Sequence, residues 1–228
     1  MDYIDVLHAM QKMKGAESMG LIATQTGESY PPVEAGTHHA VCYSVVDLGT
    51  QWSEQFHQSS HKVAITWEFP ELRIDVERDG EKLNLPRALT KIYTLSLSEK
   101  ANLYNDLVAW RGKPFTQEEL DGFNVLKVVT ANCLLQVIHT QKDKKTYANI
   151  ASVMHLMKDM RKKEPENIIV QYCIQDHGLS IPQTVPDWLV KIIHKSEEWK
   201  ALTNDIPEPD PSITEEPEGP ATGDDIPF

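Results

Sequence analysis

The clearest alternation of apolar and polar residues lies between His61 and Phe69. One parity carries Val63, Ile65, Trp67 and Phe69, and the other carries Lys62, Thr66 and Glu68. Successive side chains of a strand point to opposite faces, so this pattern predicts a strand with one face in a hydrophobic core. Trp67 and Phe69 are therefore expected in the core, and Lys62 is expected on the polar side.

Similar patterns predict four more strands. They cover 38–48, 87–97, 132–141 and 145–157, and the strand at 61–69 continues through 72–76. Residues 50–60 are polar and are expected to form a loop, Asp79-Gly80 a turn, and the charged run 142–145 a hairpin turn. A helix is predicted from Ser98 to Gly112, between the third and fourth strands, and a short second helix is predicted from Thr116.

Three strands, a helix and two strands are the element order of an OB-fold, a five-stranded Greek-key barrel. The predicted fold class is therefore mainly β with added helices. Four parts are expected along the chain: a helix-and-loop appendage at 1–32, the OB-fold domain at 33–160, a strand and a helix packed on the barrel at 161–204, and a disordered acidic tail at 205–228. Whether 1–18 is a native extension stays open, because Met19-Gly20 looks like an alternative start.

Charge separates the tail from the body. The chain has a formal net charge of −12, and residues 205–228 contribute eight acids, six prolines and no Lys or Arg. Low hydrophobicity and uniform charge leave the tail without the apolar burial that would offset the entropy of ordering. Residues 1–204 carry a net charge of −4, so binding to phosphate requires a local basic strip rather than a basic body.

The sequence gives no sign of a membrane or export signal. No run of 18 apolar residues occurs, so no membrane-spanning helix is expected, and the N-terminus lacks the basic and apolar regions of a secretory signal. The three cysteines, Cys42, Cys133 and Cys173, are widely spaced within apolar segments. They are expected to be buried, reduced thiols of a cytoplasmic protein.

The last five residues carry the most specific signal. They read Asp224, Asp225, Ile226, Pro227 and Phe228, behind the acidic and proline-rich segment. An apolar hook flanked by carboxylates suits a pocket that holds an aromatic ring beside basic groups. This ending resembles the tail of bacterial single-stranded-DNA-binding proteins and of some phage-encoded ones. The stretch that begins WRGKPF and runs to Met157 is also similar to phage replication proteins of this type.

The resemblance implies a function and a setting. In that family an OB-fold holds single-stranded DNA, and the tip at 224–228 recruits replication, recombination and repair enzymes. The resemblance thus implies a non-enzymatic protein of a phage or other mobile element, acting in the cytoplasm of a bacterial host. Its partners would be single-stranded DNA and the recruited enzymes, with no membrane. Homo-oligomers occur in the family, and the resemblance leaves the oligomeric state, site size and sequence preference open.

Single-strand binding requires cations along the path of the backbone and aromatic faces on which bases stack. The candidate DNA-binding residues are Tyr43, Trp52, Lys62, Arg73, Arg87, Lys91, Tyr93, Lys142, Lys144, Lys145 and Tyr147. Arg87, Lys91 and Tyr93 share one parity of the third strand, and Lys145 and Tyr147 repeat the spacing of a cation two residues from an aromatic ring.

Several aromatic and basic residues have two interpretations. Trp52 either stacks on bases or packs, and the side of Tyr43 cannot be assigned. The lysines of the hairpin turn are either solvated or DNA contacts, since the loop between strands four and five of an OB-fold commonly binds nucleic acid. Trp110, Trp188 and Trp199 occupy apolar helix positions and are expected to pack.

Enzyme and adaptor functions are the alternatives. His57 and His61 are four residues apart, but no carboxylate or cysteine completes a ligand set at a familiar spacing, so no metal and no other cofactor is expected. A DNA-processing enzyme of the nuclease type would need clustered acids, yet alternation places Glu68 and Glu71, which lie near Asp75, on opposite faces. The acidic body keeps open an OB-like protein adaptor that binds no DNA.

Overall fold

The computed structural model describes residues 31–78 and 81–204. The chain divides into two units, Met1–Pro31 and Pro32–Phe228, and nearly all the described residues belong to the second. The predicted N-terminal helix, the Asp79-Gly80 turn and the acidic tail lie outside the described residues. In the part that is described, no helix is long and apolar enough to span a membrane.

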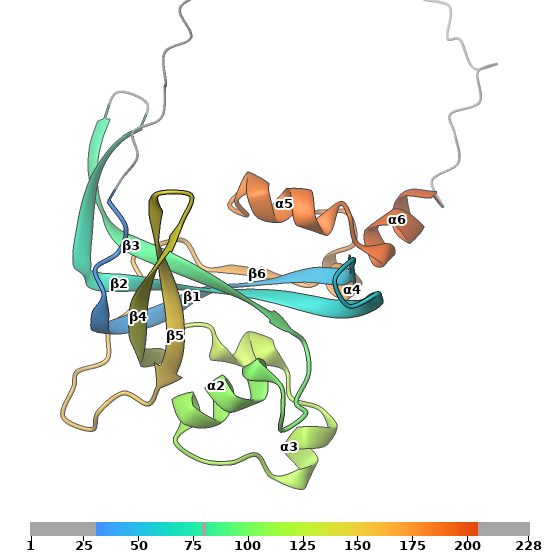
Figure 1. Ribbon diagram of the computed structural model, residues 1–228, viewed down its shortest axis with the longest axis horizontal. Helices are drawn as coiled ribbons and strands as arrows, with labels where there is room; N and C mark the ends of the chain where they lie inside the picture. The colour runs from blue at the N-terminus through green and yellow to red at the C-terminus, as the bar shows by residue number, and fades with distance from the viewer. Residues whose placement is uncertain (1–30, 79–80, 205–228) are drawn as a thin grey trace, which may run out of the picture. The chain divides into compact units, whose positions relative to one another are not determined.

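Six strands form one sheet (Figure 1). They are β1 (Gly36–Ser53), β2 (Gln58–Arg78), β3 (Glu81–Thr94), β4 (Asn132–Lys142), β5 (Lys145–Met154) and β6 (Val170–Tyr172). The strand order is β3-β2-β1-β4-β5 with antiparallel pairs throughout, and β6 runs parallel to β1. The sheet curls so strongly that its two edge strands, β3 and β5, also contact each other. Its shape is that of a half-barrel.

Five α-helices accompany the sheet within the described ranges. They are α2 (Asn102–Arg111), α3 (Gln117–Asp121), α4 (Ile174–His177), α5 (Asp187–Ile193) and α6 (Glu197–Asn204), and a 3-10 helix, η2 (Val125–Val128), precedes β4. The α2, α3 and η2 helices lie together beneath the curled sheet, and α5 and α6 lie on its other side (Figure 1). The prediction of a mainly β fold with added helices is confirmed.

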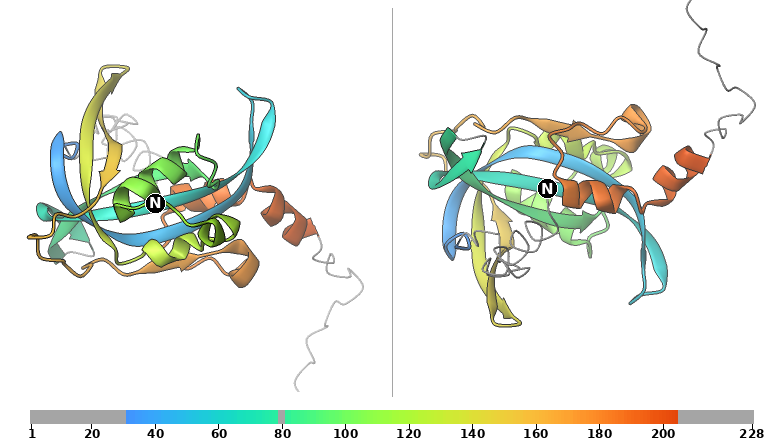
Figure 2. Two further views of the ribbon diagram at one scale, coloured as in Figure 1. Left: turned by 90° about the horizontal axis from the view of Figure 1, so that it is seen from below. Right: turned by 90° about the horizontal axis from the view of Figure 1, so that it is seen from above.

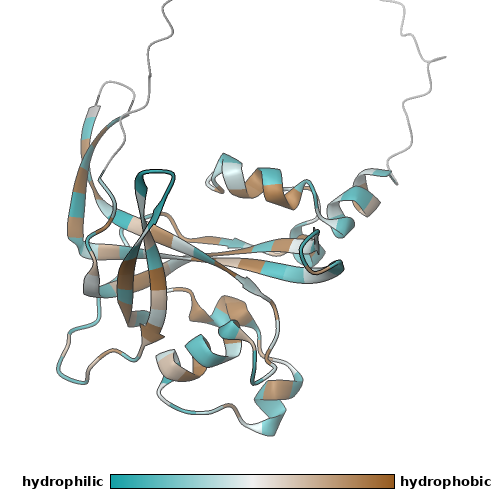
Figure 3. Cartoon of the chain, viewed as in Figure 1, coloured by the Kyte–Doolittle hydropathy of each residue, from teal (hydrophilic) through white to brown (hydrophobic). Residues whose placement is uncertain are grey.

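Two hydrophobic cores hold these layers together. The first fills the inside of the curl, where Trp67 and Phe69 are fully buried as predicted and Trp110 of α2 packs against Trp67. The second lies on the opposite face of β1 and β2, where Leu189 and Ile193 of α5 cover it. In Figure 3 brown apolar segments occur along the strands, on α5 on one side of the sheet and on the helices on its other side. Burial of apolar area is the main source of stability at both interfaces.

The predicted polar side of β2 is largely inaccessible. Thr66 is 7% exposed and Glu68 is fully buried. Glu68 accepts hydrogen bonds from the backbone N–H groups of Glu166 and Asn167 and from the side chain of Asn167. A buried carboxylate needs such donors. The connection between β5 and β6 supplies them, so alternation within β2 alone does not reveal the burial.

The segment 50–60 is not one loop as predicted: residues 50–53 and 58–60 are strands, and only 54–57 form the turn between them. Thr50 to Ser53 pair with Gln58 to His61, so β1 and β2 extend into a polar two-stranded ribbon. Glu198 of α6 accepts hydrogen bonds from the backbone N–H and hydroxyl of Thr50, both at 2.6 Å, and Glu197 accepts one from Ser59. An isolated ribbon of this composition is marginal in water, so these contacts from α6 explain why it forms.

The predicted C-terminal helix is two helices. α5 ends at Ile193 and α6 begins at Glu197, and the buried hydroxyl of Ser196 accepts a hydrogen bond from the Trp199 backbone N–H. The predicted packing of Trp199 is confirmed, since it lies against the second core and over the His194 ring at 4.4 Å. Trp188 was expected to pack but is 47% exposed, because α5 buries the neighbouring face that carries Leu189.

Candidate nucleic-acid interface

The β4–β5 hairpin gathers four of the predicted residues on exposed positions. Lys142 is paired directly with Lys145, and Thr140 with Tyr147. These residues have the opposite parity to the buried Val137, so they share the outer face of the hairpin. Tyr147 is 47% exposed. Lys142, Lys144 and Lys145 are also exposed, and none of the three makes an ion pair in the described part of the chain.

A tight turn sets this arrangement. Asp143 and Lys144 have φ values of 50° and 63°, the left-handed conformation that both central residues of a two-residue type I′ turn adopt. Such a turn matches the right-handed twist of the flanking strands. It therefore brings the ammonium groups of Lys142 and Lys145 to the same face, two residue pairs along the hairpin from the tyrosine ring.

The β1–β2 hairpin carries the second exposed group of aromatic side chains. Trp52 is 55% exposed and Phe56 is 66% exposed, and the ring of His57 lies 6.4 Å from that of Trp52, edge to face. Trp52 is thus available for stacking. Phe56 was not among the residues predicted from the sequence, although it belongs to the same segment as Trp52.

Both hairpins project from the same side of the body, and both views of Figure 2 agree on this. The strand β3 lies between them. On its outer face Ile92 is 43% exposed, and Thr94, its neighbour two residues on, accepts a hydrogen bond from Lys62 Nζ at 2.7 Å. We group Lys62, Ile92 and the two hairpins as one candidate surface and call it the hairpin face.

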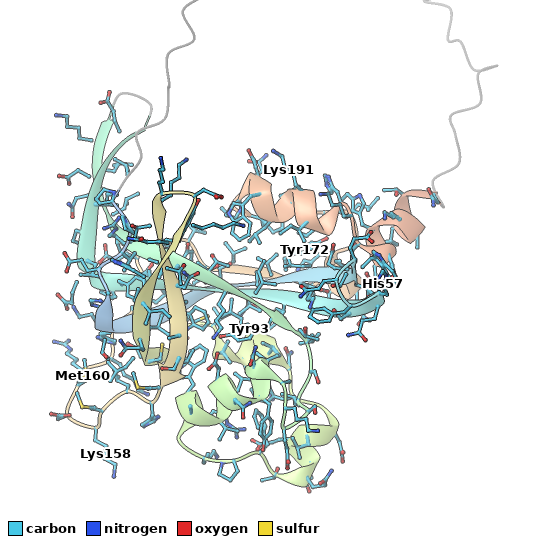
Figure 4. All side chains as sticks on the ribbon, in the orientation of Figure 1. His57, Tyr93, Lys158, Met160, Tyr172 and Lys191 are labelled. Carbon is cyan, nitrogen blue, oxygen red and sulfur yellow. The ribbon has the colours of Figure 1, made fainter. Side chains whose placement is uncertain are left out.

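Lys91 and Tyr93 point away from this surface. Tyr93 is 3% exposed, within the first core, and lies between the sheet and the helices beneath it (Figure 4). Its hydroxyl donates to Asp106 of α2 at 2.8 Å, and Lys91 forms an ion pair with the same carboxylate at 2.7 Å. Burial, followed by the charge of Asp106, raises the pKa of Tyr93 well above its usual range. The expectation of an exposed Tyr93 is wrong, since β3 turns this parity inward.

Arg73 and Arg87 are also engaged by the protein. Arg73 donates from Nε and Nη2 to Asn84 and from Nη1 to Glu166, at 2.6 to 2.8 Å. Arg87 Nη1 donates to the Pro32 carbonyl at 3.3 Å. The Arg73 guanidinium stabilises the arm formed by the far ends of β2 and β3, and that of Arg87 contacts the segment before β1, so both are left out of the hairpin face.

Tyr43 lies half-buried beside the bulge between Cys42 and Ser44. Burial and, to a lesser extent, the nearby charge of Glu68 raise the pKa of Tyr43 to about 12. Because Tyr43 is half-buried, it is not one of the exposed residues of the hairpin face. Cys42 and Cys133 are buried as predicted and Cys173 is half-buried, all as free thiols.

The acids and histidines considered for catalysis do not converge. Glu71 pairs with Lys163, and Asp75 accepts a hydrogen bond from Asn84. His61 lies 2.6 Å from Asp47 and 3.6 Å from Glu198, where it joins the β1–β2 ribbon to α6. Across residues 31–78 and 81–204, no group of three His, Cys, Asp or Glu side chains is placed to hold a metal ion.

A comparison with known protein families and with curated protein sequences finds no match for this chain. The five C-terminal residues that carry the resemblance lie outside the described residues.

Proposed function

We propose that the protein binds single-stranded DNA along the hairpin face and catalyses no reaction on it. The DNA backbone would contact Lys142, Lys144 and Lys145, and bases would stack on Tyr147 at one hairpin and on Trp52 at the other. Basic groups along a path with exposed aromatic rings are the requirement for sequence-tolerant single-strand binding.

The observation that carries the proposal is the state of the hairpin lysines. Arg73, Lys91 and Lys163 are held by acids of the protein, whereas other exposed lysines of the described chain lack an ion pair, and only the hairpin combines three of them with an exposed tyrosine predicted to stack. The lysines at 142, 144 and 145 have no such partner there, and Tyr147 lies exposed beside them. Counterion release from phosphate favours cations of this kind, because no internal ion pair has to break first. A local basic strip of this sort can attract phosphate even though the rest of the protein carries a net negative charge.

The topology supports an OB-fold as the framework. Strand order β3-β2-β1-β4-β5, contact between β3 and β5, and α2 placed between β3 and β4 in the chain are the features expected of that barrel. OB-folds bind oligonucleotides on the face of strands two and three and through the loops after strands one and four. The β1–β2 and β4–β5 hairpins occupy the positions of those two loops.

Recruitment is the second part of the proposed function. Asp224, Asp225, Ile226, Pro227 and Phe228 would dock replication or recombination enzymes while the hairpin face holds DNA. The support for this part is the resemblance of the sequence, which also suggests a phage or other mobile element as the source.

An adaptor that binds protein instead of DNA is the second candidate. Exposed apolar side chains away from the hairpin face favour it, since Ile168 is 71% exposed and Trp188 of α5 is 47% exposed. Such residues commonly mark protein contacts when they are clustered.

Tryptophan fluorescence during titration with oligo-dT separates the two candidates. Single-strand binding predicts quenching that is strong with oligo-dT, weak with duplex DNA and reduced by salt. A Trp52→Phe variant should lose most of the quenching, whereas the matched Trp188→Phe variant should keep it. Absence of quenching together with absence of a gel shift would leave the adaptor as the better interpretation.

A further inference from the structure

A second basic site lies at the other end of β5 from the hairpin. A pocket of about 530 Å³ opens between α2, η2 and the connection that follows β5. Figure 4 labels Lys158 and Met160 on that connection, far below the hairpin tip. Because β5 has 10 residues, about 30 Å separates this pocket from the β4–β5 turn.

The lining of the pocket combines cations with an apolar floor. Lys127, Lys158, Lys162 and Arg111 contribute the cations, and none of the described residues that line the pocket is Asp or Glu. All three lysines are exposed and make no ion pair within the described ranges. Trp110 and Leu156, 6% and 7% exposed, form part of the floor. An apolar cavity with a few convergent polar groups is the usual form of a small-ligand site.

One hydrogen-bond donor of Arg111 has no acceptor among the described residues. Its guanidinium stacks over the Phe115 ring at 4.2 Å, and Nη2 donates to Glu119. Nη1 is buried and has no partner among the described residues. A buried N–H without an acceptor is unfavourable, and a ligand oxygen in the pocket would satisfy it.

The basic wall of the pocket is held in place at both ends. At one end, His155 Nδ1 donates to the Trp110 carbonyl at 3.0 Å. At the other end, Asn132 accepts from the Lys163 backbone N–H and donates to its carbonyl, both at 2.9 Å. The lysines at 158 and 162 are therefore carried by a connection that is tied to α2 and to β4, so the pocket exists before any ligand arrives.

We propose that this pocket binds a nucleoside monophosphate group, with the phosphate on Lys158, Lys162 and Arg111 and the base on the apolar floor. The phosphate supplies several acceptor oxygens for the lysines and for Arg111 Nη1. Inorganic phosphate alone would leave the floor uncovered. The proposal deepens the proposed function if the group is the phosphorylated end of a DNA strand, and it stands apart from that function if the group is a free nucleotide.

The test uses the full chain labelled with ¹⁵N and thymidine 5′-monophosphate as the ligand. The indole N–H signal of Trp110 reports on the pocket floor. We expect a saturable shift of this signal, no comparable shift with thymidine or inorganic phosphate, and at least about tenfold weaker binding after the joint substitution Lys158→Gln and Lys162→Gln. The pair Lys158→Arg and Lys162→Arg should retain binding, which guards against a loss caused by misfolding.

A matched control separates the pocket from the hairpin face. Joint substitution Lys142→Gln and Lys145→Gln should weaken oligo-dT binding and leave the response to the mononucleotide unchanged. If this variant binds both oligo-dT and the mononucleotide as the original chain does, the proposed hairpin face is wrong, whereas the pocket proposal is supported. Tighter binding of a 5′-phosphorylated oligo-dT than of the unphosphorylated one would assign the ligand to a strand end, and equal binding would assign it to a free nucleotide.

Three results would overturn the pocket proposal. One is equal binding of thymidine and its monophosphate, which removes the role of the cations. Another is full retention of mononucleotide binding by the glutamine pair at 158 and 162. The third is a shift of the Trp110 signal by a peptide of residues 218–228 with none by the mononucleotide, which would assign the pocket to the chain's own acidic segment.

Discussion

Lys142 and Lys145 face each other as a directly paired couple at the tip of the β4–β5 hairpin. Like charges in this position repel one another, and no acid of the described chain forms an ion pair with either. A phosphate group placed between them would remove the repulsion. The two-residue turn pairs the two lysines, and the paired lysines form the proposed contact with the DNA backbone.

Replacing both lysines by glutamine should weaken binding of oligo-dT by about tenfold at moderate salt and should do so equally for other base compositions. The slope of log affinity against log salt should fall by about 0.7 for each lysine. Fluorescence titrations between about 50 and 200 mM salt measure both quantities. The exposed pair Lys100 and Lys113, beside α2, is the matched control, and an equal loss in that variant would show a general charge effect instead.

Tyr147 should contribute by stacking rather than by charge. Its ring is 47% exposed on the same face as the lysine pair. Substitution Tyr147→Ala should therefore cost about 1–3 kcal/mol of binding free energy and leave the salt slope unchanged, whereas Tyr147→Phe should bind almost as the original chain does. An alanine variant with full affinity would exclude this residue from the interface.

Asp106 should matter for stability and not for DNA. Its carboxylate accepts from Tyr93 and pairs with Lys91 at the junction of β3 and α2. The substitution Asp106→Asn removes the charge that Lys91 needs in this largely buried position, so we expect a loss of about 1–3 kcal/mol in the free energy of unfolding. Urea denaturation measures the loss. Unchanged stability with reduced oligo-dT binding would return Lys91 and Tyr93 to the DNA surface.

The contrast between Tyr147 and Tyr93 shows what alternation can and cannot predict. In both strands a cation and a tyrosine share a parity, and parity alone correctly places each pair on one face. In β3 the same parity also carries Leu89, which packs against the first core, so the shared face is the inner one. The tip of the β4–β5 hairpin is polar and has no apolar residue such as Leu89 that would turn this face inward. The sequence alone therefore predicts that Lys145 and Tyr147 face outward.

Long-range partners explain the remaining differences. The polar residues at 50–53 and 58–60 form strands because Glu197 and Glu198 of α6 hold the ribbon. Glu68 is buried because residues 166 and 167 donate to it. These partners lie about a hundred residues or more away in the chain, so a local sequence pattern does not predict them. The short capping-box helix at Thr116 was predicted, since both of its hydrogen bonds are local.

Buried tyrosines should make the protein unstable in alkali. Burial is the first cause that raises the pKa of Tyr43 and of Tyr172 to about 12, and that of Tyr93 still higher. An unfolded tyrosine titrates near pH 10, so the folded chain holds these protons more tightly. The stability they contribute is fully present below about pH 10 and is lost as the pH rises toward 12, by about 1.4 kcal/mol per pH unit for each group.

Urea midpoints measured in steps above about pH 9 test this expectation. The substitution Tyr43→Phe should remove the contribution of one tyrosine to the loss of stability per pH unit. The substitution Tyr147→Phe, at an exposed position, is the control. A midpoint that stays constant up to about pH 12 would contradict the burial of these hydroxyls.

The acidic tail should compete with DNA for the hairpin face. Residues 205–228 carry eight negative charges and no positive one, so they resemble a short stretch of nucleic acid in charge. Removing them should raise the affinity for oligo-dT most at low salt, and the gain should shrink as salt screens the interaction. Neutralising the eight acids by Asn and Gln at full length should have the same effect. Equal affinities of the two forms at every salt concentration would mean that the tail serves only to bind other proteins.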